Sequence, residues 1–344
     1  MSSETRSMNQ TMSDHIHRDA IVIDATCPLL NTHSHLVDWW IEGGATAAAP
    51  TVGGFDDAGE TLRNLARWNR LIEQDTRLRL IRSAADIEAV KQAGKFGIVY
   101  HFQGTAPIED DLDLVAIYKQ LGVGIIQLAY NVKNRVGDGC EERTDAGLSY
   151  FGVDLIARLN REKVIVDCSH TGNRTTLEAI DRSTAPVVFS HANVKALVPS
   201  MRTITNEQIK AVAATGGLIG AVGFPAFVSD DPQPTLDQFI DHIAYVADLV
   251  GIDHVALGID YFAGQAGVAD QATADRIYAN AINSGHWKPE SYPPPPYHYP
   301  QGIETPQTLQ NLTARLLERG FSEDDTRKIL GGNWMRVYRA VWGA

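Results

Sequence analysis

The sequence has few cysteines, little basic charge and no long apolar run. Its three cysteines, Cys27, Cys140 and Cys168, are too few and too scattered for a disulfide framework or a cysteine-rich zinc site. They indicate reduced thiols and therefore a cytoplasmic protein. Because 42 acidic residues outnumber 30 basic ones, the net charge of −12 argues against a nucleic-acid partner.

The two ends of the chain show no pattern of a targeting segment. Residues 1–18 are polar and contain no apolar stretch of the kind that a signal peptide carries, and the C-terminus has no tail typical of a lipid anchor. No apolar run reaches the length that spans a bilayer, so we expect no membrane partner. We expect a flexible N-terminal arm over 1–18 and one domain over 19–344.

Short apolar runs alternate with segments of helical periodicity along most of the chain. The runs are continuous, which is typical of parallel strands covered on both faces. No glycine-rich phosphate loop follows any of them, which argues against a Rossmann or P-loop site. Repeated βα units at this length favour the α/β class and a (β/α)8 TIM barrel. The expected strands cover 20–24, 46–52, 97–102, 123–130, 163–168, 186–190, 217–222 and 254–259.

A proline-rich segment over 285–302 interrupts this alternation. It contains a run of four prolines between Tyr292 and Tyr297. Such a run favours polyproline II and cannot join a helix or a central strand. We expect a long loop that lies over one face, or a lid or subunit contact, because long loops inside a compact domain tend to be functional.

Histidine and aspartate side chains stand at the carboxyl ends of three expected strands, where a barrel has its active site. His170 ends one strand and His191 ends the next. Neighbouring parallel strands lie about 4.8 Å apart, so these two side chains can converge on one ion. Asp260 ends the last strand and is placed to take a proton from a metal-activated water. The three residues predict a metal-assisted hydrolase site.

Each of these residues has a plainer interpretation. A lone histidine at a strand end is usually a hydrogen-bonded structural residue, and Asp260 alone is compatible with a helix cap or an arginine partner. The repeated Ser-His context on consecutive strands favours the metal interpretation. Other polar strand-end residues are Asp24, His101, Gln103, Tyr130 and Asn131.

Several sequence blocks, in a fixed order, carry a family resemblance. They are Val164–Thr171, Pro186–Ala192, His254–Asp260, Leu121–Val123, Gly147–Gly152 and Gly332–Arg336. Together they resemble the renal (membrane) dipeptidase family of metallopeptidases, within the amidohydrolase-like superfamily. The resemblance implies a TIM-barrel hydrolase, typically with two zinc ions, that cleaves dipeptides or related small amides and is often a homodimer.

The resemblance also implies roles for individual residues. His170 and His191 fall at two ligands of one metal, and Asp260 falls at the catalytic aspartate. Arg202 falls at the arginine that binds the substrate carboxylate, a task that suits a bidentate guanidinium. Tyr130 falls at a histidine that contacts the substrate. Asn131 beside it, and His101 on a neighbouring strand, are the other expected substrate-binding residues.

The chain departs from the family pattern at three metal ligands. Thr26 and Pro28 stand where the family has a His-x-Asp pair, and Gln103 replaces the bridging glutamate. A second divalent ion would have little compensating charge there. We therefore expect one divalent metal, zinc, held by the two strand-end histidines with Gln103. His33 and His35, in a loop, are candidate substitute ligands.

Three functions stay open. The favoured one is a one-metal hydrolase of a dipeptide or a small carboxylate-bearing amide. The second is an enzyme of a different reaction on the same scaffold, such as a lyase or an iron-dependent enzyme, because two histidines and a carboxylate also suit iron. The third is a non-catalytic binding protein that has lost its metal site.

Overall fold

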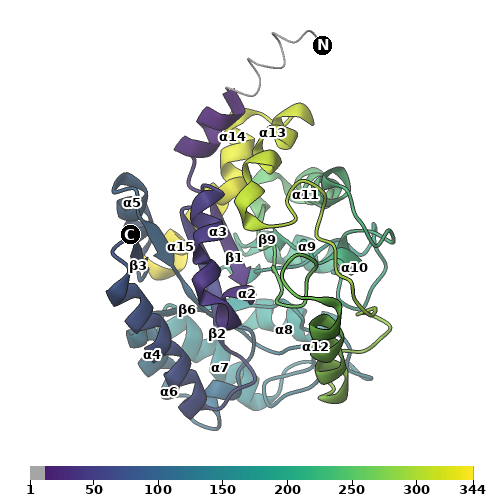
Figure 1. Ribbon diagram of the computed structural model, residues 1–344. Helices are drawn as coiled ribbons and strands as arrows, with labels where there is room; N and C mark the ends of the chain where they lie inside the picture. The colour runs from purple at the N-terminus through teal and green to yellow at the C-terminus, as the bar shows by residue number, and fades with distance from the viewer. Residues whose placement is uncertain (1–11, 344) are drawn as a thin grey trace.

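Parallel strands form a curled sheet enclosed by helices in the computed structural model, which describes residues 12–343 (Figure 1). All the strand pairings within the sheet are parallel. The strands are β1 (Ile23–Cys27), β2 (Ala47–Gly53), β3 (Leu78–Leu80), β4 (Phe96–Ile98), β5 (Tyr100–Phe102), β6 (Val123–Gln127), β7 (Ile165–Asp167), β8 (Val187–Phe189), β9 (Leu218–Ala221) and β10 (Val255–Leu257).

The two ends of this sheet meet. The strand order is β10-β9-β8-β7-β6-β5-β2-β4-β3, with β1 also paired to β2. Just beyond β10, the backbone N–H of Asp260 donates to the carbonyl of Thr26 at 3.0 Å, and that of Ile259 donates to the Asp24 carboxylate at 2.9 Å. Asp24 thus ties the first strand to the last. The predicted TIM-barrel fold is confirmed, with β4 and β5 as consecutive parts of one barrel strand and β3 outside it.

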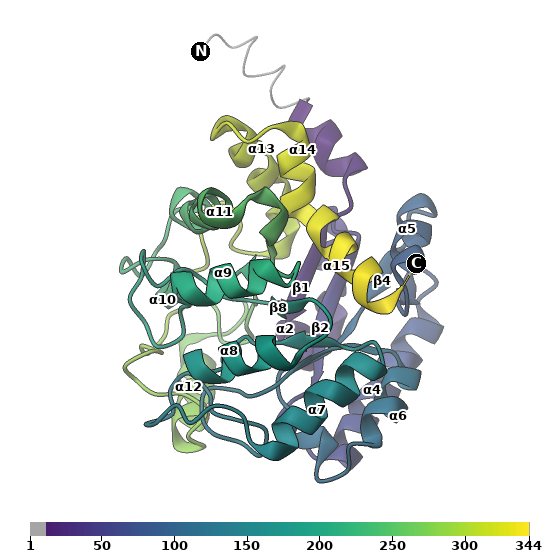
Figure 2. The ribbon, with the colours of Figure 1, turned by 180° about the vertical axis from the view of Figure 1, so that it is seen from behind.

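Helices follow most strands and cover the outside of the barrel, and Figure 2 shows α7, α8 and α9 side by side. Several begin at a capping residue that satisfies free backbone N–H groups, such as the capping boxes at Ser83, Thr205 and Thr235. The helices are α2 (Leu29–Thr32), α3 (Val37–Glu42), α4 (Ala58–Gln74), α5 (Ala84–Gln92), α6 (Leu114–Leu121), α7 (Tyr150–Arg161), α8 (Asn173–Arg182), α9 (Asn206–Ala214), α10 (Pro225–Val228), α11 (Leu236–Val250), α12 (Gln271–Asn283), α13 (Gln310–Glu318), α14 (Glu323–Arg327) and α15 (Asn333–Trp342).

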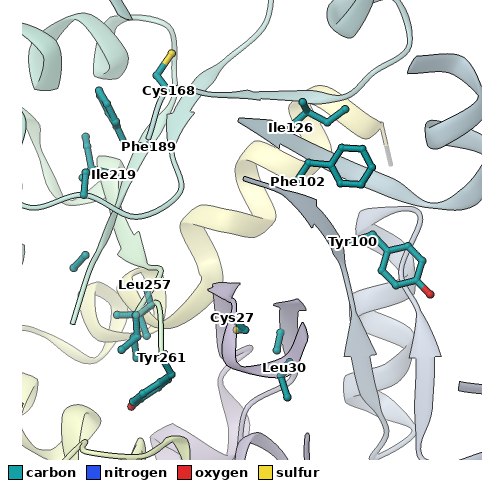
Figure 3. Close-up of a cluster of buried hydrophobic side chains, with 14 of the residues drawn as sticks. Cys27, Leu30, Tyr100, Phe102, Ile126, Cys168, Phe189, Ile219, Leu257 and Tyr261 are labelled. Carbon is teal, nitrogen blue, oxygen red and sulfur yellow. The ribbon is translucent and has the colours of Figure 1, made fainter. Parts of the chain in front are cut away.

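The core has two layers because successive strand residues point to opposite faces. One layer lies between strands and helices, and Figure 3 shows side chains of this layer, including Phe102, Phe189 and Leu257. The other fills the barrel interior with small and branched residues and is closed by α15. Trp342 of α15 packs so closely on Gly124 that a Cβ there would meet the indole at 2.5 Å. This helix seals the end where the strands begin and leaves the other end for a site.

The N-terminal arm differs from the prediction over 12–18. Residues 12–19 are helical, and Ile16 and His17 are buried. The ring nitrogens of His17 lie 2.7 Å from the Thr313 hydroxyl and 2.8 Å from the Gly43 carbonyl, so two specific contacts hold a segment that looks polar overall. The rest of the predicted arm, 1–11, lies outside the described residues, and a single domain over 19–344 stays a prediction.

The proline-rich segment has no helix or strand over 285–302, in agreement with its composition. It follows α12, a helix that the sequence pattern did not predict. Among the described residues, 12–343, no helix is long and apolar enough to cross a membrane.

Candidate metal and hydrolase site

The structure brings His170 and His191 together at the carboxyl ends of β7 and β8. Their Nε2 atoms lie 2.9 Å apart, and both side chains are buried. His170 has a φ of 66°, in the left-handed region that non-glycine residues rarely occupy. Strain of this kind persists only where the surroundings fix it and often marks a functional site.

The hydrogen bonds of His170 fix which of its nitrogens carries a proton. Its Nδ1 lies 2.6 Å from Oδ1 of Asn131, which can only accept. The orientation of the Asn131 amide is set independently, because its nitrogen donates to the carbonyl of His286 at 2.9 Å. In a neutral ring, Nδ1 of His170 is therefore the donor and Nε2 carries the lone pair.

The hydrogen bonds of His191 also fix which of its nitrogens carries a proton. Its Nδ1 lies 2.8 Å from Oγ of Ser190, and that hydroxyl already donates to the Asp167 carboxylate at 2.5 Å. The Ser190 oxygen therefore accepts from His191, and Nε2 of His191 also carries a lone pair. Burial, and then the charge of Arg202, lower the pKa of both imidazoles well below the usual value, so both are neutral near pH 7.

Two lone pairs that face each other at 2.9 Å repel unless a cation lies between or beside them. Imidazole nitrogens bind zinc at about 2.0–2.1 Å, so the 2.9 Å spacing allows both to coordinate one ion. Metal-bound histidines almost always donate their other nitrogen to a neighbouring acceptor. Asn131 and Ser190 are such acceptors, so the pair fits one metal ion.

The other half of the family's metal centre does not fit. The Thr26 hydroxyl donates to Oγ of Ser190 at 3.2 Å, and Pro28 precedes α2. The amide nitrogen of Gln103 donates to Asp260 at 3.4 Å. His33 and His35 lie on the short surface segment after α2. Within 12–343, no group of three or more His, Cys, Asp or Glu side chains is arranged to hold a metal. The side chains at the family's other ligand positions, Thr26, Pro28 and Gln103, are therefore all neutral.

Asp260 lies at the open end of the barrel, where it lines a cavity of about 220 Å³ with Gln103 and Tyr130. It has a φ of 65°, so the same left-handed strain marks the expected catalytic aspartate. Desolvation raises its pKa to about 7, although the Arg202 charge acts in the opposite direction. Near neutral pH this carboxyl is therefore able to both accept and donate a proton.

Arg202 is a buried cation without a carboxylate partner among the described residues. One of its terminal nitrogens donates to the His191 carbonyl at 3.2 Å, and its Nε has no hydrogen-bond partner. The guanidinium lies 5.4 Å from the ring centre of Phe227. Arg202 and His170 both line a separate cavity of about 160 Å³. A buried, unpaired guanidinium favours an anionic ligand.

The three other expected substrate-binding residues lie in different surroundings. Tyr130 stacks on His170, with ring centres 3.9 Å apart, and lines the cavity of Asp260. Asn131 is buried and orients His170. His101 is fully buried, with Nε2 3.2 Å from the Asp167 carboxylate and Nδ1 unpaired. The structure therefore brings Tyr130 to the cavity and places Asn131 and His101 behind the histidine pair.

Asp167 is a residue that the sequence reasoning did not single out. It accepts hydrogen bonds from the hydroxyls of Ser169 and Ser190, and it contacts His101. Burial opposes its charge, but the contact with His101 holds the pKa of this carboxyl well below its usual range. The sequence signal for this role was a carboxylate within the apolar run Val164–Cys168. A buried charge needs hydrogen-bonding or charged partners, and so points to polar groups nearby.

Comparisons with known proteins show which family this chain resembles. The sequence model described as membrane dipeptidase (peptidase family M19) matches residues 10–290 and 296–343. The dipeptidase tcpJ of Claviceps purpurea is 28% identical over 82% of this chain, which spans only 60% of that protein. An uncharacterised protein from Klebsiella pneumoniae, encoded in the pqqA 5′ region, is 30% identical over 81% of this chain and 95% of its own length.

Solved structures show the same fold. An amidohydrolase from Pseudomonas aeruginosa superposes with a TM-score of 0.84 at 34% identity, covering 96% of this chain and 99% of its own. A metallopeptidase from Rhodobacter sphaeroides, liganded with a phosphinate mimic of L-Ala-D-Ala, has a TM-score of 0.76 at 20% identity, over 94% of this chain and all of its own. The fold, the near-complete match to the family model and these relatives show that the chain belongs to the membrane dipeptidase family, peptidase family M19.

Proposed function

We propose that the protein hydrolyses the amide bond of a dipeptide, or of a similar small amide with a free carboxylate, with one zinc ion bound by His170 and His191. The observation that carries this proposal is the pair of facing Nε2 lone pairs at 2.9 Å. The neutral side chain of Gln103 offers an amide oxygen as a further ligand, while its nitrogen remains on Asp260.

The ion, when bound, supplies an activated water and polarises the amide carbonyl. The chain's own residues do the rest. Asp260 accepts a proton at its carboxylate and returns it to the leaving amine, for which a pKa of about 7 is suitable. Asn131, and Asp167 through Ser190, hold the two imidazoles in the tautomer that presents Nε2. His101 supports Asp167 from the opposite side.

The free carboxylate of the substrate pairs with Arg202. This guanidinium is buried and has an unpaired Nε, so a carboxylate provides the acceptor that the described residues do not. A bidentate pair with a buried guanidinium is among the stronger charge-assisted contacts. Tyr130 packs between the Asp260 cavity and His170, where it orients the substrate chain.

The test is hydrolysis of a dipeptide panel by the native protein, by metal-stripped protein and by stripped protein reloaded with zinc. We expect activity that is lost on stripping, restored by zinc and absent in His170→Ala and His191→Ala. His254→Gln is a matched control, because that ring precedes β10, at the end of the strand opposite Asp260, and hydrogen-bonds to the Gly217 carbonyl at 2.8 Å. Activity that survives stripping, or that survives in both histidine variants, would contradict the proposal.

Iron chemistry is the second candidate, because two imidazoles beside a carboxylate also suit an iron enzyme. Co-purification of iron in place of zinc, with oxygen-dependent turnover, would favour it. A protein that binds no metal and hydrolyses no dipeptide would instead be a binding protein. The homodimer and the cytoplasmic location are proposals too. Sedimentation velocity tests the first, and cell fractionation tests the second.

A further inference from the structure

The cavity beside Asp260 has an unusual lining. Rings form much of its wall, beside Asp260, Gln103 and the polar side chains of Asn31, Thr51 and Asp56. They come from the β2–α4 loop, the segments after β6, β9 and β10, and the proline-rich segment after α12. The rings are those of Phe55, Tyr130, Phe224, Phe262, His286, Trp287 and Tyr292.

These rings form a fixed wall because they pack on one another. Trp287 and Tyr292 stack with ring centres 4.3 Å apart and planes within 7°. Phe262 and Phe224 lie against Trp287, at 5.2 and 5.9 Å between ring centres. Contacts of this kind add to the stability that burial provides. The cavity is therefore preformed, as ligand sites usually are.

The polar atoms of these rings are bound within the protein. The indole nitrogen of Trp287 donates to the Tyr130 hydroxyl at 3.0 Å. The Tyr292 hydroxyl accepts from the Asn131 amide at 3.1 Å. With their polar atoms paired to each other, the rings offer mainly carbon to a ligand. An apolar group that packs against these rings loses its water contacts without taking a partner from the ring polar atoms.

The charged side chains in the wall of this cavity disfavour a carboxylate there. The charged side chains in its wall are Asp56 and Asp260, and both are acidic. Desolvation lowers the pKa of His286, so this ring adds no positive charge near pH 7. Arg202, the buried guanidinium described above, lines the other cavity together with Lys195. We therefore expect the carboxylate of a substrate to bind near Arg202 and its apolar part to bind in the ring-lined cavity.

The mouth of the cavity is formed by Phe55 and His286, which stack with ring centres 3.9 Å apart. Phe55 is 49% exposed, so one part of its ring is open to solvent while the other packs on His286. Both rings, with Tyr130, also line an adjoining outer cavity of about 390 Å³. A ligand that enters from this outer cavity passes the two rings first.

We propose that this cavity is a specificity site for an aromatic or large aliphatic side chain, carried by the residue on the amino side of the scissile amide. An apolar cavity of about 150 Å³ holds a benzene ring, so about 220 Å³ has room for the side chain of phenylalanine or leucine. The assignment of the side chain to the amino-side residue rests on the proposed function, whereas the apolar preference rests on the cavity.

The kinetic test uses zinc-loaded protein and dipeptides that share a C-terminal glycine and differ in the first residue. We expect kcat/KM to rise about 10- to 100-fold from Gly-Gly to Leu-Gly and Phe-Gly, mostly through KM. Phe262→Ala enlarges the cavity and should abolish most of this preference. Phe151→Ala, on the distant helix α7, is the matched control and should keep it.

A binding test separates this inference from the hydrolase proposal. Calorimetry measures the binding of glycinamide, leucinamide and phenylalaninamide, which lack the carboxylate, to the native protein and to Phe262→Ala. Tighter binding of phenylalaninamide to native protein, lost in the variant, supports the specificity site even if no dipeptide is hydrolysed. Equal or absent binding of all three amides, or hydrolysis without side-chain preference, would overturn the site and leave the hydrolase proposal standing.

Discussion

Two halves of the same barrel mouth have different chemistry. At β7 and β8, His170 and His191 present facing lone pairs, each held by a neighbouring acceptor. At the ends of β1 and β5, the Thr26 hydroxyl donates to Ser190 and the Gln103 amide nitrogen donates to Asp260. One half presents two lone pairs to a common point, and the other presents neutral side chains that bond to protein groups. The difference teaches that the two halves of one barrel mouth need not offer a metal the same ligands, which is the basis of the one-zinc proposal.

The largest effect is expected at Asp260, the residue proposed to transfer the proton. Asp260→Asn keeps the shape of the side chain but cannot carry the proton. We expect kcat to fall about 10²- to 10⁴-fold while bound zinc remains near the native amount. Steady-state kinetics and metal analysis of the same preparation check both. Loss of zinc together with activity would show that Asp260 is a ligand and would break the division into two halves.

Arg202 is expected to have the next largest effect. Arg202→Met removes the cation, and we expect kcat/KM for a dipeptide to fall about 10- to 100-fold, mainly through KM. The matching control is a substrate change, because the C-terminal amide of the same dipeptide carries no charge. Its hydrolysis should respond little to the variant. If both substrates lose the same factor, Arg202 acts on the histidines and not on a carboxylate.

The residues that orient His191 are expected to have a smaller effect, on zinc affinity. Ser190→Ala and Asp167→Asn each interrupt the path from the buried carboxylate to His191. We expect zinc affinity to fall about 10- to 100-fold, measured by competition with a chromophoric chelator. Ser183→Ala, whose hydroxyl bonds to Asn160 and the Ala185 carbonyl, serves as the control. Unchanged affinity in the first two variants would remove Asp167 from the site.

His242, a buried histidine outside the site, differs from the histidine pair. Both ring nitrogens of His242 are paired with protein, since Nδ1 accepts from Val194 N–H at 3.1 Å and Nε2 donates to the Val228 carbonyl at 3.0 Å. Burial lowers its pKa from 6.5 to about 4. The unfolded state therefore binds more protons between these values, and stability falls as the pH drops below about 6.5.

His242 accordingly accounts for about 3 kcal/mol of the stability lost between pH 7 and pH 4. His242→Gln should flatten the pH dependence of the unfolding free energy by about that amount, in urea titrations at several pH values. The native and variant proteins would show the same slope if His242 were already protonated in the fold.

The fold and the histidine pair could be predicted because their signals are local. Continuous apolar strands give the barrel, and His170 and His191 follow two of these strands directly. The role of Asp167 could not be predicted, because it acts through Ser190 on the next strand. The ring-lined cavity could not be predicted either, because Phe55, Phe224 and Trp287 are far apart in the sequence and come together only in the fold. The helix at 12–19 depends on a few contacts, such as those of His17, that a polar composition conceals.

The measurement that tests the central claim most directly is the number of metal ions per chain. Purified, untagged protein saturated with zinc and freed of excess would be analysed by plasma mass spectrometry, beside His170→Ala and His191→Ala. We predict one zinc per native chain and none in either variant. Two zinc ions per native chain would show that the β1 and β5 half still binds metal. None would show that the facing lone pairs hold no cation.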